Sequence, residues 1–177
     1  MTPEAAITPD VLARIRARRR AGTVLRAGSF DPAGAVDRVV LDASERCRRR
    51  IVLTGEGGLR FLVDLAAATV VGDGDGLLLN DGAVVAVVAR LEPLVEITAP
   101  AGGRTPSLAL ARLAWHLGNR HVEVEIGDGR LRMRRDHVLE AMLEGLGAVL
   151  TPLEAPFEPE RGAFGHDHGA VGRGEAE

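Results

Sequence analysis

The chain has 177 residues, 46% of them hydrophobic and 27% charged, a composition typical of a soluble globular protein. Its net charge of −3 provides no overall basic surface, so we expect no nucleic-acid partner. No apolar run approaches the ~20 residues that span a bilayer, and the N-terminus lacks the pattern of a secretion signal, so we expect no membrane partner and a cytoplasmic location.

Residues 1–21 are predicted to be an N-terminal extension. Thr8 or Asp10 is suited to cap a short helix there, but a single turn of apolar residues is equally compatible with disorder. Arginines cluster at the end of this segment and again in 46–50, and we interpret both groups as solvated surface.

Residues 22–91 have the pattern of short strands separated by turns, without a convincing helix. Strands are predicted where Val, Leu and Ile are concentrated, at 36–41, 50–54, 60–64 and 84–89. The sequence Asn80-Asp81-Gly82 joins 77–79 to 84–88 as a predicted β-hairpin. We therefore expect a small all-β domain, either a barrel or a sandwich.

Residues 92–154 contain two amphipathic helical patterns. The first follows Thr105 or Ser107 as its N-cap and ends at Gly118-Asn119. Asp136 is predicted to cap the second, in which apolar residues recur at three- and four-residue spacing.

Four strands are predicted around these helices, at 94–98, 122–126, 130–134 and 148–153. In the second strand, apolar residues up to Ile126 alternate with Glu123 and Glu125, which predicts a half-buried strand whose glutamates face arginines of the next strand, at about 0.2–1 kcal/mol per pair. The order strand, helix, strand, strand, helix, strand is the ferredoxin-like βαββαβ plan, so the chain as a whole is predicted to be α+β. Residues 155–177 are rich in Pro, Gly and Glu and are predicted to form a flexible tail.

The histidines are placed unevenly. All five follow residue 115: His116, His121, His137, His166 and His168. Neutral imidazole is a common ligand for nickel, zinc and copper, so this bias points to a metal site. The tail sequence His166-Asp167-His168 is interpreted as a short chelating tract, with a solvated polar tail as the alternative.

His121 lies at a predicted boundary between helix and strand, where it is exposed and free to point outward. Alone it would be one weak ligand. His116 is interpreted as a partly buried histidine of the first helix. His137 is interpreted as first-turn surface of the second helix, or as an auxiliary ligand near the first site.

No catalytic constellation is present in the sequence, and we expect no enzyme activity. The serines lack the flanking glycines of a nucleophile elbow, and Cys47, the only cysteine, lies among arginines with no histidine nearby. Residues 72–76, Gly-Asp-Gly-Asp-Gly, lack the downstream Glu of an EF-hand and are interpreted as a β-turn.

Several of these motifs together resemble the urease accessory protein UreE family of nickel chaperones. The similar segments are 115–121 (Trp-His-Leu-Gly-Asn-Arg-His), 135–143 with the following Gly145-Leu146-Gly147-Ala148, 73–77 with 80–82, and 155–160 (Ala-Pro-Phe-Glu-Pro-Glu). The similarity runs from about residue 24 to residue 168, nearly the whole chain apart from the N-terminal 21 residues.

The resemblance implies a peptide-binding-type β-domain over 22–91 and a metal-binding domain over 92–154. It also implies a homodimer formed through the metal domain, in which His121 of both subunits binds one Ni²⁺ ion and the tail residues His166 and His168 assist. Twofold symmetry would supply the second ligand that a lone histidine lacks. Zn²⁺ or Cu²⁺ is expected to compete with Ni²⁺. The implied partners are the apo-urease complex and the accessory GTPase that drives nickel insertion.

The sequence departs from the family pattern at Arg135, which replaces the first histidine of a His-x-His pair and leaves only His137 as an auxiliary ligand there. Two other classes stay open. In an interaction module the histidines would be incidental. A metal-dependent hydrolase would need acidic or basic residues beside the metal.

Overall fold

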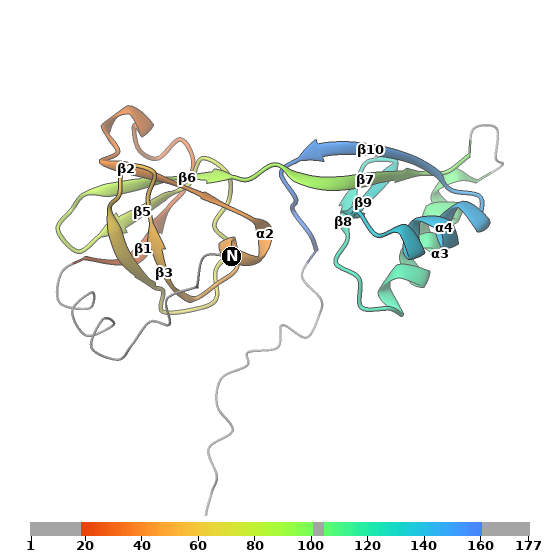
Figure 1. The fold of residues 1–177 in the computed structure, drawn as a ribbon, viewed down its shortest axis with the longest axis horizontal. Coiled ribbons are helices and arrows are strands. Elements are labelled where there is room, and N and C mark those ends of the chain that lie inside the picture. The colour runs from red at the N-terminus through yellow and green to blue at the C-terminus, as the bar shows by residue number, and fades with distance from the viewer. Residues whose placement is uncertain (1–18, 101–104, 161–177) are drawn as a thin grey trace, which may run out of the picture.

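The computed structural model describes residues 19–100 and 105–160. It contains two sheets, and the chain passes directly from the last strand of the first sheet into the first strand of the second (Figure 1). The greater part of the predicted extension, and the tail from residue 161 with His166 and His168, lie outside the described residues. No helix in the described ranges has both the length and the apolar character needed to span a membrane.

The N-terminal sheet has six strands in the order β2-β6-β5-β1-β4-β3. Their bounds are β1 Arg20–Leu25, β2 Asp37–Leu41, β3 Arg50–Thr54, β4 Arg60–Asp64, β5 Gly76–Leu79 and β6 Val84–Ala89. β2 pairs with β6 and β1 with β4 in parallel, and the other pairs are antiparallel. The predicted hairpin is confirmed as β5 and β6, with Gly82 at a φ of 85° in its turn.

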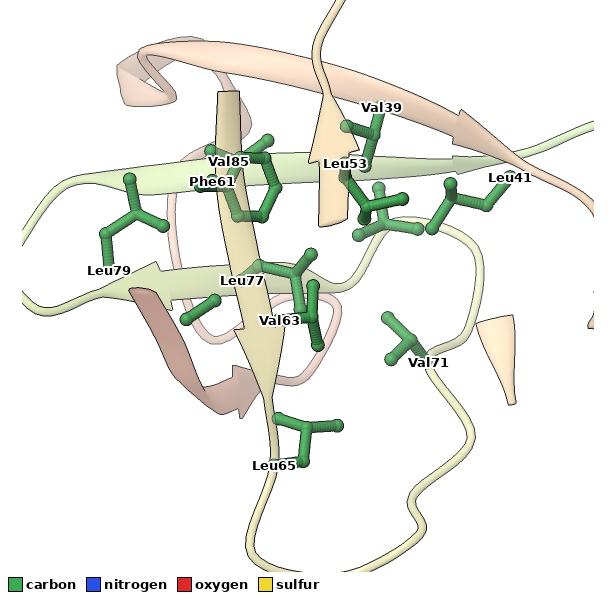
Figure 2. Packing of buried hydrophobic residues seen from close by; sticks show 12 residues of the cluster. Val39, Leu41, Leu53, Phe61, Val63, Leu65, Val71, Leu77, Leu79 and Val85 are labelled. Atoms are coloured by element: carbon green, nitrogen blue, oxygen red, sulfur yellow. The ribbon is translucent and has the colours of Figure 1, made fainter. Parts of the chain in front are cut away.

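The interior of this sheet is filled almost entirely by aliphatic side chains. Figure 2 shows Phe61 as the one aromatic ring in a cluster that otherwise consists of Val, Leu and Ala. Alternate residues point inward, such as Leu77 and Leu79 in β5 and Val85 and Val87 in β6, as the period of two in a strand requires. Each fully buried side chain of this size contributes about 1.5–3 kcal/mol, so aliphatic packing compensates for the scarcity of aromatic rings.

Asp37 connects the two edges of this sheet. Its carboxylate accepts hydrogen bonds from the amides of Gly57 at 2.8 Å and Leu59 at 2.9 Å, both in the turn between β3 and β4. Because β2 and β3 are the two edge strands, these bonds show that the sheet curls round on itself. The amide of Gly57 and the further amide donors hold the pKa of Asp37 below its ordinary value, since they stabilise the charged form.

Three features of the N-terminal half differ from the prediction. β1 begins at Arg20, inside the segment that we predicted as an extension. A 3-10 turn, η1 (Pro32–Gly34), and a one-turn helix, α2 (Ala43–Arg46), occur where no helix was expected. Arg46 is only 2% exposed, so its interpretation as solvated surface was wrong.

The C-terminal sheet has four antiparallel strands in the order β10-β7-β9-β8. The elements of this half are β7 Glu92–Thr98, α3 Pro106–Gly118, β8 Glu125–Gly127, β9 Arg130–Arg134, α4 His137–Gly145 and β10 Val149–Ala155. Both helices cover one face of the sheet (Figure 1). Their buried leucines, Leu113, Leu117 and Leu143, pack there against Val95 and Ile97 of β7.

Most of the predicted local contacts in this half are confirmed. Asp136 caps α4 by accepting hydrogen bonds from two backbone amides. Glu125 pairs with Arg132 at 3.2 Å, and Glu123 pairs with Arg134. Thr105 is the N-cap of α3 but makes no capping bond with its side chain.

Two predictions about this half were wrong. β8 has three residues, and Ile126, which the alternation placed on the buried face of a half-buried strand, is 58% exposed. β10 continues to Ala155, and Phe157 beyond it is fully buried, so the first residues of the predicted tail are packed against the rest of the molecule. Phe157 shares a small cluster with Leu94 of β7 and Ala43 of α2, and this cluster connects the two halves.

Candidate metal centre

The turn that ends α3 fixes the position of His121. The amide of His121 donates to the carbonyl of Gly118 at 3.0 Å, and the amide of Val122 donates to the carbonyl of Leu117 at 3.2 Å. This pair of bonds forms a Schellman motif, in which the residue in the position of His121 adopts a left-handed conformation and is usually glycine. His121 has a φ of 56°, and within 19–100 and 105–160 it is the only residue other than glycine with a positive φ.

Core residues on both sides of this turn hold it in place. Leu117 is fully buried, and Val122 packs on the same core cluster as Leu117. His121 itself is exposed. A left-handed conformation costs roughly 1–2 kcal/mol for a residue with a side chain, so histidine occupies a position that glycine would occupy at lower cost. Such a position points to a role for the imidazole rather than for the backbone.

His121 borders a surface hollow of about 360 Å³. Glu123 and Glu160 also line this hollow, so two acidic residues share it with His121. The carboxylate of Glu123 is paired with Arg134. Glu160 is the last described residue, and its amide donates to the carbonyl of Val124 at 2.8 Å. The chain that continues to His166 and His168 therefore leaves the described part of the molecule at the hollow of His121.

The other histidines of the described ranges do not join this hollow. The ring of His116 packs edge-to-face against Trp115 with centroids 5.0 Å apart, and it is partly buried, as predicted. His137 is the exposed first residue of α4 and does not line the hollow of His121. Nowhere among the described residues do three or more His, Cys, Asp or Glu side chains come together as a metal site. The described part of one chain thus contributes His121 as a single imidazole.

Apolar surface adjoins the hollow of His121. A second hollow, of about 650 Å³, lies between α3 and the β8–β9 turn. It shares Ala114 and Ile126 with the first, and Leu110 and Leu131 also line it. The exposed side chain of Ile126 thus forms a wall common to both hollows.

The loop over 72–76 has a structural explanation. Asp75 is 3% exposed, and its carboxylate accepts hydrogen bonds from Arg26 at 2.7 Å and from the amides of Ala27 at 2.9 Å and Gly72 at 2.8 Å. This carboxylate is occupied within the domain, which agrees with the interpretation of the segment as a turn rather than a calcium loop.

Sequence reasoning missed two residues that the structure brings to the site or its surroundings. Glu160 lines the hollow of His121 but lies far from it in the sequence, so only the fold reveals the proximity. Arg46 is buried beside the segment that leads to Glu160. A sequence signal existed for the helical turn α2, because Asp42 and Glu45 form a capping box, but not for the burial of Arg46.

Two family models match the chain. The model of the UreE urease accessory protein N-terminal domain matches residues 17–90, and that of the C-terminal domain matches residues 92–176. The chain belongs to the UreE family. Family membership confirms the resemblance seen in the sequence, together with a two-domain α+β architecture of sheets and few helices.

Relatives in the UreE family are similar over most of this chain. The urease accessory protein UreE of Bradyrhizobium sp. (strain BTAi1) is 51% identical over 141 residues, which is 80% of this chain and 66% of the relative. That of Bradyrhizobium sp. (strain ORS 278) is 51% identical over 138 residues, 76% of this chain and 63% of the relative. That of Chelativorans sp. (strain BNC1) is 47% identical over 140 residues, 76% of this chain and 85% of the relative.

The chain spans just under two thirds of the length of the Bradyrhizobium relatives that it matches. UreE is a family of accessory proteins rather than enzymes, which agrees with the prediction that this chain is not an enzyme.

Proposed function

We propose that this chain is a metallochaperone that binds Ni²⁺ and delivers it to apo-urease during assembly of the active site of urease. The names of the relatives supply the link to urease. The observation that carries the metal-binding role is His121, an exposed residue held in a left-handed turn beside a hollow that Glu123 and Glu160 also line. The accessory GTPase implied by the resemblance is the second proposed partner.

In this proposal the nickel site lies between two copies of the chain. Each subunit contributes His121, and the twofold axis doubles the single ligand that one chain offers. The exposed Ile126 and the apolar hollow beside His121 support a homodimer through this face, because burial of such surface favours association. The strand order β10-β7-β9-β8 with both helices on one face supports a ferredoxin-like plan for this domain. The N-terminal sheet is then the proposed peptide-binding domain.

The tail histidines complete the proposed site. His166 follows Glu160 by six residues, a stretch that reaches at most about 22 Å at ~3.3–3.6 Å per residue. Because Glu160 lies at the hollow of His121, that reach brings His166 and His168 within range of the ion. His137 lines no part of the hollow and is proposed only as a weaker auxiliary ligand.

A site with so few ligands from each chain favours exchange over permanent retention. Structural metal sites have a closed ligand set, whereas this one leaves coordination positions for a recipient or for water. Imidazole ligands do not exclude Zn²⁺ or Cu²⁺, which are therefore proposed competitors.

Nickel titration by calorimetry, combined with mass measurement by light scattering, tests the proposal. We expect about one tightly bound Ni²⁺ per dimer, and we expect His121→Asn to abolish it. Asn is the matched replacement because it tolerates the left-handed conformation, so the turn is preserved. His116→Asn, which changes a histidine on the neighbouring turn of α3, should bind Ni²⁺ as the original chain does. Unchanged tight binding in His121→Asn would refute the interfacial site. Absence of tight binding in the original chain would favour an interaction module.

A further inference from the structure

The one-turn helix α2 of the N-terminal domain is bound at both ends by the C-terminal domain. At its first residue, the amide of Ala43 donates to the carboxylate of Glu92 at 2.9 Å. At its last residue, the guanidinium of Arg46 donates to the backbone carbonyl of Phe157 at 2.5 Å and to the carboxylate of Glu158 at 3.0 Å. Figure 1 shows α2 on the side of its own domain that faces the C-terminal domain. These five residues form the domain junction.

Arg134 of β9 connects the parts of the junction that belong to the C-terminal domain. Its guanidinium donates to the second carboxylate oxygen of Glu92 at 2.7 Å and lies 4.9 Å from the centre of the Phe157 ring. It also donates to the hydroxyl of Ser44 in α2, at 3.4 Å. Glu92 begins β7 and Phe157 follows β10, so three segments of the C-terminal domain converge on one turn of helix.

The charged groups of the junction are withdrawn from water. Arg46 is 2% exposed and Glu92 is 6% exposed, and Ala43 and Phe157 belong to a buried apolar cluster. Relative motion is the default expectation for two domains whose interface is not large and hydrophobic. Hydrogen bonds to charged groups, however, contribute more to stability than neutral ones and are strengthened where water is excluded. Separation of the domains would break the hydrogen bonds of Ala43 and Arg46 together.

α2 depends on these contacts for its own conformation. A helix of four residues is far shorter than the ~12–15 residues that an isolated helix needs in water. Within its own domain, α2 has the capping box formed by Asp42 and Glu45, and Arg46 exchanges hydrogen bonds with Val71 through its guanidinium and its carbonyl. The contacts of α2 are therefore divided between the two domains, and a change in their relative position would disrupt one set.

We propose that the domain junction locks the two domains into one relative orientation. An apolar side chain at position 46 would fill the space without the desolvation cost of a charge and without a buried unpaired donor such as Nε of Arg46. What the guanidinium adds is direction, because its planar fork fixes its acceptors relative to one another. The carboxylate of Glu92, which accepts from donors of both domains, constrains the other end of α2 in the same way. The lock keeps the N-terminal domain at a fixed position relative to His121. It does not depend on nickel and so goes beyond the proposed function.

Residual dipolar couplings measured by NMR on the full chain without metal test the lock directly. In the original chain we expect the N–H couplings of β5 and β6 and those of β7 and β9 to fit a single alignment tensor, because the two domains then form one rigid body. In Arg46→Met, which keeps an apolar side chain of similar length, we expect the common tensor to be lost. Arg48→Met, which changes an exposed neighbour, is the matched control and should retain it. Two tensors in the original chain, or one common tensor in Arg46→Met, would overturn the proposal.

Amide hydrogen exchange gives a second measurement, which keeps the lock testable if Arg46→Met fails to fold. Glu158→Ala removes an ion-pair acceptor whose side chain is 52% exposed, so this variant is expected to fold. Exchange at the amide of Ala43, at the opposite end of α2, should accelerate about two- to fivefold, as the modest strength of an exposed ion pair allows. In Arg46→Met the same amide should exchange about tenfold faster or more. Exchange at Leu77, in the core of the N-terminal domain, should stay unchanged and serves as the reference. An Ala43 amide that exchanges at its original rate in both variants would refute the lock.

Discussion

At His121 the backbone adopts a conformation that glycine would adopt at lower cost. The Schellman motif at the end of α3 requires a left-handed residue, and Leu117 and Val122 hold the chain on both sides of it. The imidazole therefore projects from a rigid base rather than from a loose loop. A histidine on such a base loses little conformational freedom when it binds an ion.

His121→Gly should separate stability from metal binding. Relief of the left-handed strain raises the free energy of unfolding by about 1–2 kcal/mol. The greater conformational freedom of glycine in the unfolded chain lowers it again by about 0.5–1 kcal/mol. We therefore expect the free energy of unfolding to rise by about 0.5–1 kcal/mol in urea titrations, while tight nickel binding disappears. His121→Ala retains the left-handed cost and serves as the comparison. Equal stability of the Gly and Ala variants would contradict the argument from strain.

At the scale of elements, the N-terminal sheet depends on a carboxylate at the point where its edges meet. The carboxylate of Asp37 accepts hydrogen bonds from backbone amides of the β3–β4 turn. A Cβ atom added to Gly55 of that turn would lie 2.2 Å from this carboxylate. The turn must therefore carry glycine for the carboxylate to approach. This contact joins β2 to a hairpin that pairs at the far side of the sheet.

Loss of this carboxylate should make the protein less sensitive to acid. The amide of Gly57 keeps the folded-state pKa of Asp37 below its unfolded value, so the stabilisation is present above the unfolded pKa and is lost as pH falls through the folded pKa. We expect Asp37→Asn to lower the free energy of unfolding at pH 7 by about 1 kcal/mol and to flatten its decline below about pH 4. Urea titrations from pH 7 to pH 3 measure both effects. Asp81→Asn, in the exposed β5–β6 turn, is the control. An unchanged slope in Asp37→Asn would contradict the assignment.

Elements with local signals could be predicted from the sequence. The turn Asn80-Asp81-Gly82 predicts the β5–β6 hairpin, and Asp136 predicts the start of α4; both are confirmed. β1 could not be predicted in full, because it begins among arginines and its pairing register shifts between Ala21 and Thr23. α2 has a single turn, and Arg46 at its end is buried by residues that only the tertiary fold brings close.

The candidate site, too, could be predicted from the sequence only in part. His121 could be singled out from its motif, but its left-handed conformation and its proximity to Glu160 depend on the turn and on strand pairing. The alternation with glutamates placed Ile126 on the buried face of a half-buried strand. Its exposure follows from the short pairing of β8, an edge strand of only three residues.

At the scale of the whole molecule, that exposed isoleucine bears on assembly. Ile126 forms a wall common to the hollow of His121 and the larger apolar hollow. If a second copy covers this face, burial of the side chain contributes about 1.5–3 kcal/mol to association.

Ile126→Glu should therefore weaken the dimer about tenfold or more and reduce nickel affinity together with it. Light scattering over a dilution series gives the dissociation constant, and a nickel titration at each concentration gives the coupling. Val138→Glu is the matched control, since Val138 is 64% exposed on α4 but lines neither hollow. A dimer that is equally stable in Ile126→Glu would place the interface on another face.

The pairing of β7 with β10 has a consequence for exchanging parts between relatives. Glu92, the first residue of β7, lies opposite Ala155, the last residue of β10, so the C-terminal domain is entered and left at one point. The two ends of this domain are therefore adjacent, and residues 92–155 can be exchanged between relatives through two neighbouring fusion points. The junction sets the condition for a working chimaera: α2 must come from the same parent as the residues that follow Ala155, because Arg46 and Phe157 meet across the fusion point.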